Sequence, residues 1–230
     1  MIFGGIRKLT LIDYPGKTAC TLFTPGCNFR CPFCHNASLV CGDGEGRTID
    51  AMEVLGFLET RQGLLDGVVI SGGEPLLHRE LGAFIGEVKA LGYPVKLDTN
   101  GSYPDELKAL VRSGAVDYVA MDIKNAPENY ARTIGAPDYD LAPVEESRAF
   151  LLSGAVPFEF RTTVVREFHS AEDLVALARW ISPAENYYLQ GFIDSGEVLQ
   201  SGLHGYTAAE MRQFLDKIHL ILPTAELRGI

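Results

Sequence analysis

This chain has no stretch approaching the roughly eighteen consecutive apolar residues of a membrane-spanning helix. Its first residues also lack an apolar segment followed by small residues, the pattern of a secretory signal. No low-complexity tract, long charge run or linker divides it, and 230 residues suit one ordinary domain covering residues 1–230. The sequence therefore predicts a single cytoplasmic domain with no membrane partner.

Positive charge is also scarce. Lysine and arginine together number 20 against 30 aspartate and glutamate residues, which gives a net charge of -10 at pH 7. Such an acidic chain is poorly suited to neutralising phosphates, so we expect no nucleic-acid partner. Intrinsic disorder is excluded, because 47% of the residues are hydrophobic and only 22% are charged. The five cysteines are an odd count, which disfavours a secreted disulfide framework.

Short β-branched or apolar runs alternate with segments of helical period along the chain. The predicted strands are residues 18–23, 68–70, 95–97, 116–121, 158–165 and 187–189. Apolar residues recur at i, i+3, i+4 and i+7 in four predicted helices, at residues 51–58, 81–88, 174–181 and 211–218. Thr207 and Glu210 form a capping box before the last helix, and Pro104 opens a further one. We expect a broken or two-part helix over residues 127–152, because prolines interrupt it.

Six strands alternating with helices predict right-handed βαβ units and a parallel sheet. Six units fall short of the eight that close a barrel. We therefore favour an α/β fold built as an open, partial (β/α)6 barrel over a doubly wound sheet. Both architectures place the functional site in the loops at the carboxyl ends of the strands, so polar motifs in those loops are the candidates.

The first such loop carries Cys27, Cys31 and Cys34 at a C-x-x-x-C-x-x-C spacing. Three thiolates on one loop can converge on one inorganic centre, and thiolates select soft metals and iron–sulfur clusters. A [4Fe–4S] cluster with only three protein ligands keeps one open position, as catalytic metal sites require. A structural Cys3His zinc site using His35 is the weaker alternative, because adjacent Cys34 and His35 cannot easily converge on one tetrahedral ion. Ordinary core cysteines are weaker still, given the polar residues around them.

The run C-N-F-R-C-P-F-C over residues 27–34 resembles the signature of the radical S-adenosylmethionine (SAM) enzymes. The resemblance implies that the three cysteines hold one [4Fe–4S] cluster, whose unique iron binds the amino and carboxylate groups of SAM. It also implies that the reduced cluster cleaves SAM to methionine and a deoxyadenosyl radical, which abstracts a hydrogen atom. Phe33 and His35, on the same loop, are expected to border the cofactors.

Polar motifs also follow the next three strands, with G-G-E-P at 72–75, D-T-N-G at 98–101 and D-I-K at 122–124. Each motif alone is typical of a turn or a cap. Together they resemble the SAM site of glycyl-radical-enzyme activating proteins. That resemblance implies a cofactor-binding set of Gly72, Gly73, Glu74, Asp98, Thr99, Asp122 and Lys124. In this set Glu74 meets the SAM amino group, the aspartates help to place SAM and a monovalent cation, and Lys124 contacts SAM.

The last two strands supply two further candidates. Arg161 is a candidate for the SAM carboxylate or the substrate backbone, with a surface salt bridge as the alternative. Gln190 stands in the region where pyruvate formate-lyase activating enzymes place a ligand-contacting histidine, which weighs against pyruvate formate-lyase as the target. Asp13 also matches the family, with an open role. His169 is expected to be an ordinary loop histidine.

For the other cysteines and histidines the sequence predicts structural or surface positions rather than catalytic ones. Cys20 lies inside the first strand, which predicts core packing. Cys41 lies in the Gly-rich stretch 41–46, which predicts a mobile loop. Two spare thiols cannot hold a second cluster. Surface positions are expected for the remaining histidines, which are His78, His204 and His219.

The resemblance spans nearly the whole chain and is strongest to the activating proteins of anaerobic ribonucleoside-triphosphate reductase. It implies that the chain removes a hydrogen atom from a backbone glycine of that partner under anaerobic conditions. A reduced flavodoxin or ferredoxin-type protein would donate the electron. Activation of pyruvate formate-lyase or another glycyl radical enzyme is the alternative. Two other classes compete, a radical SAM enzyme acting on a small molecule, such as 7-carboxy-7-deazaguanine synthase, and a non-catalytic metal module.

Overall fold

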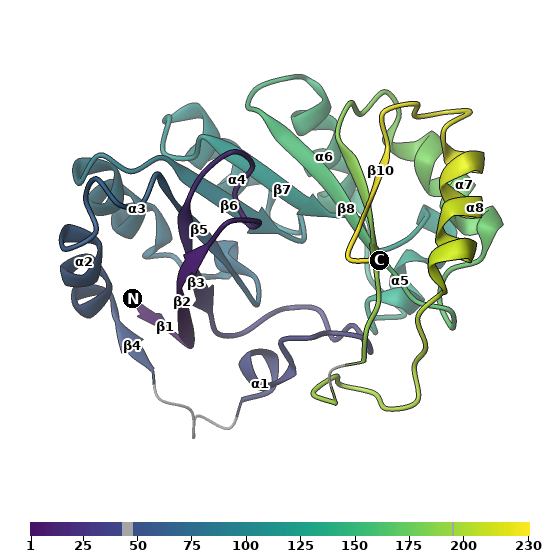
Figure 1. Ribbon diagram of the computed structural model, residues 1–230, viewed down its shortest axis with the longest axis horizontal. Helices are drawn as coiled ribbons and strands as arrows, with labels where there is room; N and C mark the ends of the chain where they lie inside the picture. Colours follow the sequence, from purple (N-terminus) through teal and green to yellow (C-terminus); the bar gives the residue numbers. More distant parts are fainter. Residues whose placement is uncertain (43–47, 195) are drawn as a thin grey trace.

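The computed structural model describes residues 1–42, 48–194 and 196–230, and its centre is an eight-stranded sheet (Figure 1). The strand order is β10-β9-β8-β7-β6-β5-β3-β2. Six of these strands confirm the predicted ones, namely β3 (Ala19–Thr24), β5 (Gly67–Gly72), β6 (Val95–Thr99), β7 (Tyr118–Asp122), β8 (Phe158–Val164) and β9 (Tyr187–Gly191). All six run parallel, which confirms the predicted sheet type.

Two strands absent from the sequence-based prediction extend the sheet at its edges. β2 (Gly5–Thr10) pairs antiparallel with β3, and β10 (Glu226–Arg228) pairs parallel with β9. A separate pairing joins β1 (Ile2–Phe3) to β4 (Ile49–Asp50). β2 exposes three successive residues and the other strands have only two or three residues each, so none carries the buried apolar run that reveals a strand.

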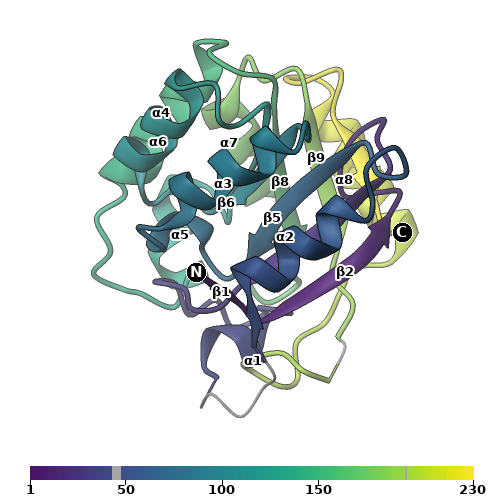
Figure 2. The ribbon, with the colours of Figure 1, turned by 90° about the vertical axis from the view of Figure 1, so that its left-hand side faces the viewer.

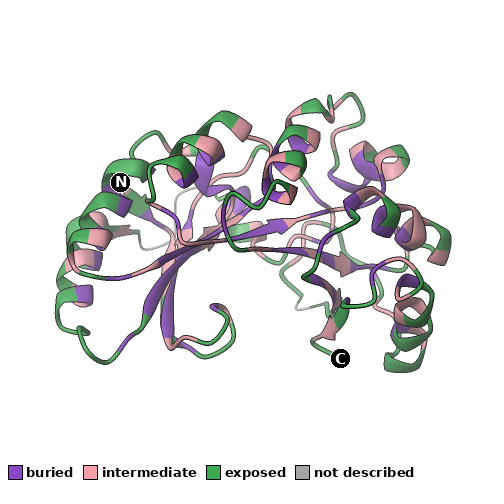
Figure 3. Ribbon diagram, turned by 90° about the horizontal axis from the view of Figure 1, so that it is seen from above, coloured by how far each residue is buried: buried purple, intermediate pink, exposed green. Residues whose placement is uncertain are grey.

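Helices lie along one face of the curved sheet (Figures 2 and 3). The predicted helices are confirmed as α2 (Ala51–Glu59), α3 (Leu81–Ala90), α4 (Pro104–Arg112), α7 (Ala171–Ile181) and α8 (Ala208–Ile218). The stretch 127–152 forms two helices, as expected, which are α5 (Pro127–Thr133) and α6 (Ala142–Leu152). The Thr207–Glu210 capping box is present. Two short elements were not expected, α1 (Ala37–Val40) and the 3-10 helix η1 (Pro75–Leu77).

No helix in the described part of the chain is long and apolar enough to cross a bilayer. The main apolar core lies between the sheet and the helices and contains fully buried residues of both. Cys20 is one of these fully buried residues, which confirms its expected role in core packing.

Strand alternation separates apolar from charged side chains on β8. Phe160 and Val164 are fully buried in the core. Glu159, Arg161 and Thr163, which alternate with them, border cavities on the other side of the sheet. Successive side chains of a strand point to opposite faces, so one face packs against the helices while the other presents polar groups. The face of the sheet opposite the helices, called the inner face, therefore carries the polar side chains of a candidate site.

The described sheet ends at β2 and β10 rather than closing on itself, so the barrel is partial, as predicted. A cavity of about 590 Å³ lies between these edges. Ile12 and Asp13, which follow β2, line one side of it, and Arg228 and Gly229, at the end of β10, line the other. This space, the lateral cavity, adjoins the site described next.

Candidate active site

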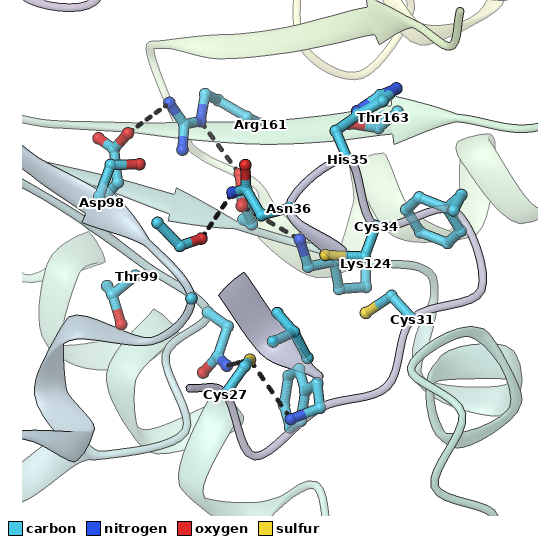
Figure 4. Close-up of a pocket in the computed structure, with 18 of the residues that line it drawn as sticks. Cys27, Cys31, Cys34, His35, Asn36, Asp98, Thr99, Lys124, Arg161 and Thr163 are labelled. Carbon is cyan, nitrogen blue, oxygen red and sulfur yellow. Dashed lines mark hydrogen bonds and ion pairs between the residues drawn. The ribbon is translucent and has the colours of Figure 1, made fainter. Parts of the chain in front are cut away.

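A second cavity, of about 390 Å³, opens at the carboxyl ends of the parallel strands, where the site was expected (Figure 4). Every predicted site residue other than Glu74 borders it, namely Cys27, Cys31, Phe33, Cys34, His35, Gly72, Gly73, Asp98, Thr99, Asp122, Lys124, Arg161 and Gln190. These residues come from six strand ends and are far apart in the sequence. The parallel topology is what brings them together, because the carboxyl ends of parallel strands meet at one edge.

Three cysteine thiols face this cavity from the loop after β3. Burial raises the pKa of Cys31 to about 12 and also raises the pKa of Cys27. The Phe29 backbone N–H and the Asn100 side-chain amide point at the Cys27 Sγ, at 3.4 and 3.7 Å. Such donors favour a thiolate, and a bound metal deprotonates a coordinating thiol outright. One buried thiol and two half-buried ones, with amide donors at one sulfur, fit an iron–sulfur centre.

His35 turns away from these thiols. Its Nε2 lies 2.8 Å from the Ile193 carbonyl oxygen, and its ring stacks on Phe192 with 5.3 Å between centroids. Figure 4 shows the His35 side chain directed away from the three sulfurs. Within the described ranges, no three His, Cys, Asp or Glu side chains are grouped to hold a single metal ion. His35 is therefore placed as a wall residue, and its position disfavours the Cys3His zinc alternative.

Four charged side chains alternate in sign along the cavity. Arg161 lies between two aspartates, with its Nη1 3.3 Å from Asp98 Oδ2 and its Nε donating to Asp122 Oδ1 at 3.0 Å. Lys124 Nζ lies 3.1 Å from Asp122 Oδ2. Arg161 is only 14% exposed, so the structure corrects the surface salt bridge considered for it.

The same contacts keep both aspartates ionised. Burial is the largest single effect and would raise their pKa values, but the attraction of Arg161 and a neighbouring lysine together outweighs it at both. Lys96 adds to this effect at Asp98, whose pKa is lowered, and Lys124 adds to it at Asp122, whose pKa falls to about 2. The cavity thus presents two carboxylates and two cations at neutral pH.

Glu74 is the predicted site residue that the structure places elsewhere. Its side chain is fully buried and accepts hydrogen bonds from Thr99 Oγ1 at 2.8 Å, Asn100 N at 2.7 Å and Leu76 N at 3.1 Å. Both carboxylate oxygens are used, so Glu74 ties the loop after β5 to the loop after β6. Glu74 does not border the cavity, and its expected contact with the SAM amino group stays a prediction.

Gly72 and Gly73, next to Glu74, let the backbone after β5 approach the start of the cysteine loop closely. Gly72 adopts a φ of 111°, and a Cβ at Gly73 would collide with the Gly26 carbonyl oxygen. The Gly73 and Glu74 N–H groups donate to Thr24 and Gly26 carbonyl oxygens at 2.8 and 2.9 Å. These glycines therefore hold the cysteine loop against β5, and they also border the cavity.

Glu74 is expected to make stability depend on pH. Burial raises the pKa of its carboxyl to about 7, against the effect of its three hydrogen bonds. A carboxyl whose pKa is raised by folding stabilises most below its unfolded pKa of about 4.3, and that contribution is lost as pH rises through the folded value. The free energy of unfolding of the wild type, relative to Glu74→Gln, should fall by on the order of 1–3 kcal/mol between about pH 5 and 8.

Urea unfolding of the cofactor-free wild type and Glu74→Gln, at matched pH values, measures this difference. The glutamine variant is the control, because it keeps the shape of the side chain without a titrating group. A difference that stays level across the range would contradict the burial of an ionisable group at this position.

Several residues bordering the cavity were not predicted, namely Phe29, Asn36, Val40, Ser71, Asn100 and Thr163. Asn36 Nδ2 donates to the Gly72 carbonyl oxygen at 2.7 Å, which links the cysteine loop to β5. Ser71 and Asn100 could have been found, because they lie inside the strand-end motifs. Alternation from Arg161 could have found Thr163. Asp13, whose role was left open, borders both cavities.

The positions of the remaining histidines and of Cys41 agree only in part with the sequence-based predictions. His169 lies in a loop but is 1% exposed, with its Nε2 2.7 Å from the Lys124 carbonyl oxygen, so it supports the loop after β7. His204 is exposed, as expected, whereas His78 and His219 are half-buried and contact backbone carbonyl oxygens. Cys41 is exposed, and most of its predicted mobile loop lies outside the described residues.

A partial parallel barrel with three cysteines at its carboxyl edge defines a class of enzyme, and sequence comparison identifies it. The Radical SAM superfamily profile matches residues 21–181, so the chain belongs to that superfamily and is a radical SAM enzyme. A [4Fe–4S] cluster and SAM follow from this membership as its cofactors.

Two named relatives cover most of the chain. A Methanocaldococcus jannaschii protein, provisionally named a glycyl-radical enzyme activating enzyme, is 32% identical over 197 residues, which are 83% of this chain and 80% of that protein. The pyruvate formate-lyase-activating enzyme of Staphylococcus aureus is 27% identical over 214 residues, which are 86% of this chain and 81% of that enzyme.

Solved structures share the fold at low identity. Streptococcus suis SuiB bound to precursor peptide SuiA matches with a TM-score of 0.71 at 14% identity, over 91% of this chain and 48% of SuiB. The chain thus spans about half the length of SuiB. Escherichia coli QueE matches with a TM-score of 0.56 at 16% identity, over 100% of this chain and 94% of QueE. These likenesses concern the fold alone.

Proposed function

We propose that this chain abstracts a hydrogen atom from a backbone glycine of a glycyl radical enzyme. The observation that carries the proposal is the group of three thiols that shares one cavity with the Asp98–Arg161–Asp122–Lys124 row. Cys27, Cys31 and Cys34 hold the cluster in this proposal. When bound and reduced, the cluster supplies the electron that cleaves SAM. The names of the two relatives support activation of a protein substrate.

The charged row has the chemistry to bind SAM, which carries an ammonium, a carboxylate and a sulfonium. Arg161 and Lys124 offer cations for the carboxylate, and Asp98 and Asp122 offer oxygens for positive groups. A monovalent cation belongs to the same proposal, held near these two carboxylates with Thr99. Phe33, His35 and Gln190 form the walls beside them. The Gly72 and Gly73 backbones border the space where the cysteine loop approaches β5.

The lateral cavity supports a macromolecular substrate. It shares Asp13, His35, Arg161, Thr163 and Gln190 with the cysteine-lined cavity, so the two spaces adjoin. Its mouth lies between two sheet edges, where a loop of a partner can enter. Leu11 and Ile12 are 72% and 80% exposed beside it. With Leu9, which is 59% exposed, they give several exposed apolar side chains close together in the chain, and contiguous apolar patches mark contacts with other proteins.

We further propose anaerobic ribonucleoside-triphosphate reductase as the partner, with pyruvate formate-lyase or another glycyl radical enzyme as the alternative. Gln190, in place of the expected histidine, borders both cavities and supports the first choice. A reduced flavodoxin or ferredoxin-type protein in the cytoplasm is the proposed electron donor.

Anaerobic reconstitution with iron, sulfide, SAM and a reductant tests the function. The reconstituted protein is mixed with each candidate partner, and electron paramagnetic resonance follows a glycine-centred doublet. A doublet on one partner supports the proposal and identifies the target. SAM cleavage without a protein radical on any candidate would overturn the target class, and absence of SAM cleavage would overturn the chemistry.

A further inference from the structure

The charged row of the cavity continues through the interior of the sheet to its β10 edge. The whole row alternates in sign, in the order Arg228, Glu159, Lys96, Asp98, Arg161, Asp122 and Lys124. The last four residues border the cysteine-lined cavity, Glu159 and Arg228 border the lateral cavity, and Arg161 borders both. Lys96 joins the two halves of the row.

Lys96 is 1% exposed, and lysines are almost never so buried unless they are paired. Its Nζ lies 2.5 Å from Asp98 Oδ1 and 4.0 Å from Glu159 Oε1. One ammonium is thus shared unequally between two carboxylates. Any change in the charge balance around Glu159 alters how strongly Lys96 is drawn toward Asp98.

Arg228, at the β10 end of the charged row, determines the charge balance around Glu159. Its guanidinium contacts both carboxylate oxygens of Glu159 at 3.0 Å and lies over the Tyr188 ring, 3.2 Å from the centroid. Glu159 is itself 1% exposed and also accepts from the Tyr118 hydroxyl at 3.3 Å. β10 has three residues and lies at the sheet edge beside β9 (Figure 1), and this ion pair attaches its last residue to a buried side chain of β8.

We propose that Arg228, Glu159 and Lys96 are positioning residues that couple the docking of β10 to the geometry of Asp98 and Arg161. The proposal rests on the proposed SAM site. With Arg228 in place, Glu159 is neutralised and Lys96 stays at Asp98. Without Arg228, the buried Glu159 carboxylate attracts the Lys96 ammonium away from Asp98. Asp98 then forms a stronger ion pair with Arg161.

The consequence reaches the cofactor site because Arg161 is shared. A guanidinium drawn toward Asp98 weakens its 3.0 Å bond to Asp122 and moves from the position where it meets the SAM carboxylate. The expected loss of SAM affinity is about tenfold, within the range of measured couplings between linked sites. Arg228 itself does not border the cysteine-lined cavity.

The test measures equilibrium binding of SAM to the anaerobically reconstituted protein in three variants. Arg228→Met should weaken binding about tenfold, and Arg228→Lys should restore most of it by keeping the charge. Arg148→Met is the matched control, because Arg148 pairs with Glu145 and lies over Trp180, 5.3 Å from its ring centroid, away from both cavities. The control should bind SAM like the wild type.

A second readout needs no cofactor. Amide hydrogen exchange in residues 98–101 of the cofactor-free protein should be faster in Arg228→Met than in the wild type, and unchanged in Arg148→Met. Unaltered exchange and affinity in Arg228→Met, or equal effects in the control, would overturn the proposal. If the wild type itself binds no SAM, the proposed function fails, and the exchange data alone decide whether β10 is coupled to Asp98.

Discussion

Replacement of Cys31 by alanine is expected to abolish SAM cleavage and the radical on the partner together. Cys31 is 7% exposed, borders the cavity with the other two thiols and lies between them in the loop. Among the described residues only three cysteines face this space, so the loss of one leaves two ligands for a centre that needs three. The rate of 5′-deoxyadenosine formation should fall on the order of 1,000-fold or more, as when an indispensable group is removed. Iron content should fall with it.

Cys20→Ala is the matched control for this prediction. Cys20 is also buried, but it lies in β3 within the apolar core and borders neither cavity. Its replacement should cost about 1 kcal/mol of stability and leave SAM cleavage intact. Equal losses of activity in the two variants would contradict the assignment of the cluster to the loop after β3.

Arg161→Met is expected to have the largest effect on SAM binding among the charged residues. Arg161 joins Asp98 and Asp122, so its loss leaves two carboxylates facing each other across the cavity. It also removes a charge-assisted donor, worth about 1.5–3 kcal/mol, from the proposed SAM carboxylate. SAM affinity should therefore fall about 10–100-fold. Titration of the reconstituted protein with SAM measures this loss.

Arg161→Lys distinguishes charge from geometry at the same position. A single ammonium cannot reproduce the fork that contacts both aspartates, so lysine should recover only part of the affinity. Full recovery with lysine would show that charge alone matters there. Wild-type affinity in Arg161→Met would contradict the place of Arg161 in the SAM site.

Most of this site could be predicted from the sequence because its residues occupy short motifs at strand ends. The cysteine loop follows a buried run that becomes β3, and D-T-N-G and D-I-K follow β6 and β7 in the same way. Once the sheet is parallel, its topology brings these ends together without further information. The helices were found for a similar local reason, since their apolar faces repeat within one or two turns.

Contacts between distant residues were not predictable in this way. The G-G-E-P motif gave no sign that the Glu74 carboxylate would be used by Thr99, Asn100 and Leu76 rather than a ligand. β10 was missed because three residues with intermediate or high exposure carry no periodic signal. The partnership of Lys96 with Glu159 depends on the pairing of β6, β7 and β8, which motifs do not encode.

Deuterium transfer is the most direct test of glycine activation by this chain. A candidate partner is produced with α-deuterated glycine and incubated anaerobically with the reconstituted protein, SAM and a reductant, and the 5′-deoxyadenosine is analysed by mass spectrometry. Direct abstraction from glycine predicts that the product carries deuterium, and that the paramagnetic signal of the partner loses its doublet splitting. Unlabelled 5′-deoxyadenosine, formed at the same rate with and without the partner, would contradict a glycine as the hydrogen donor.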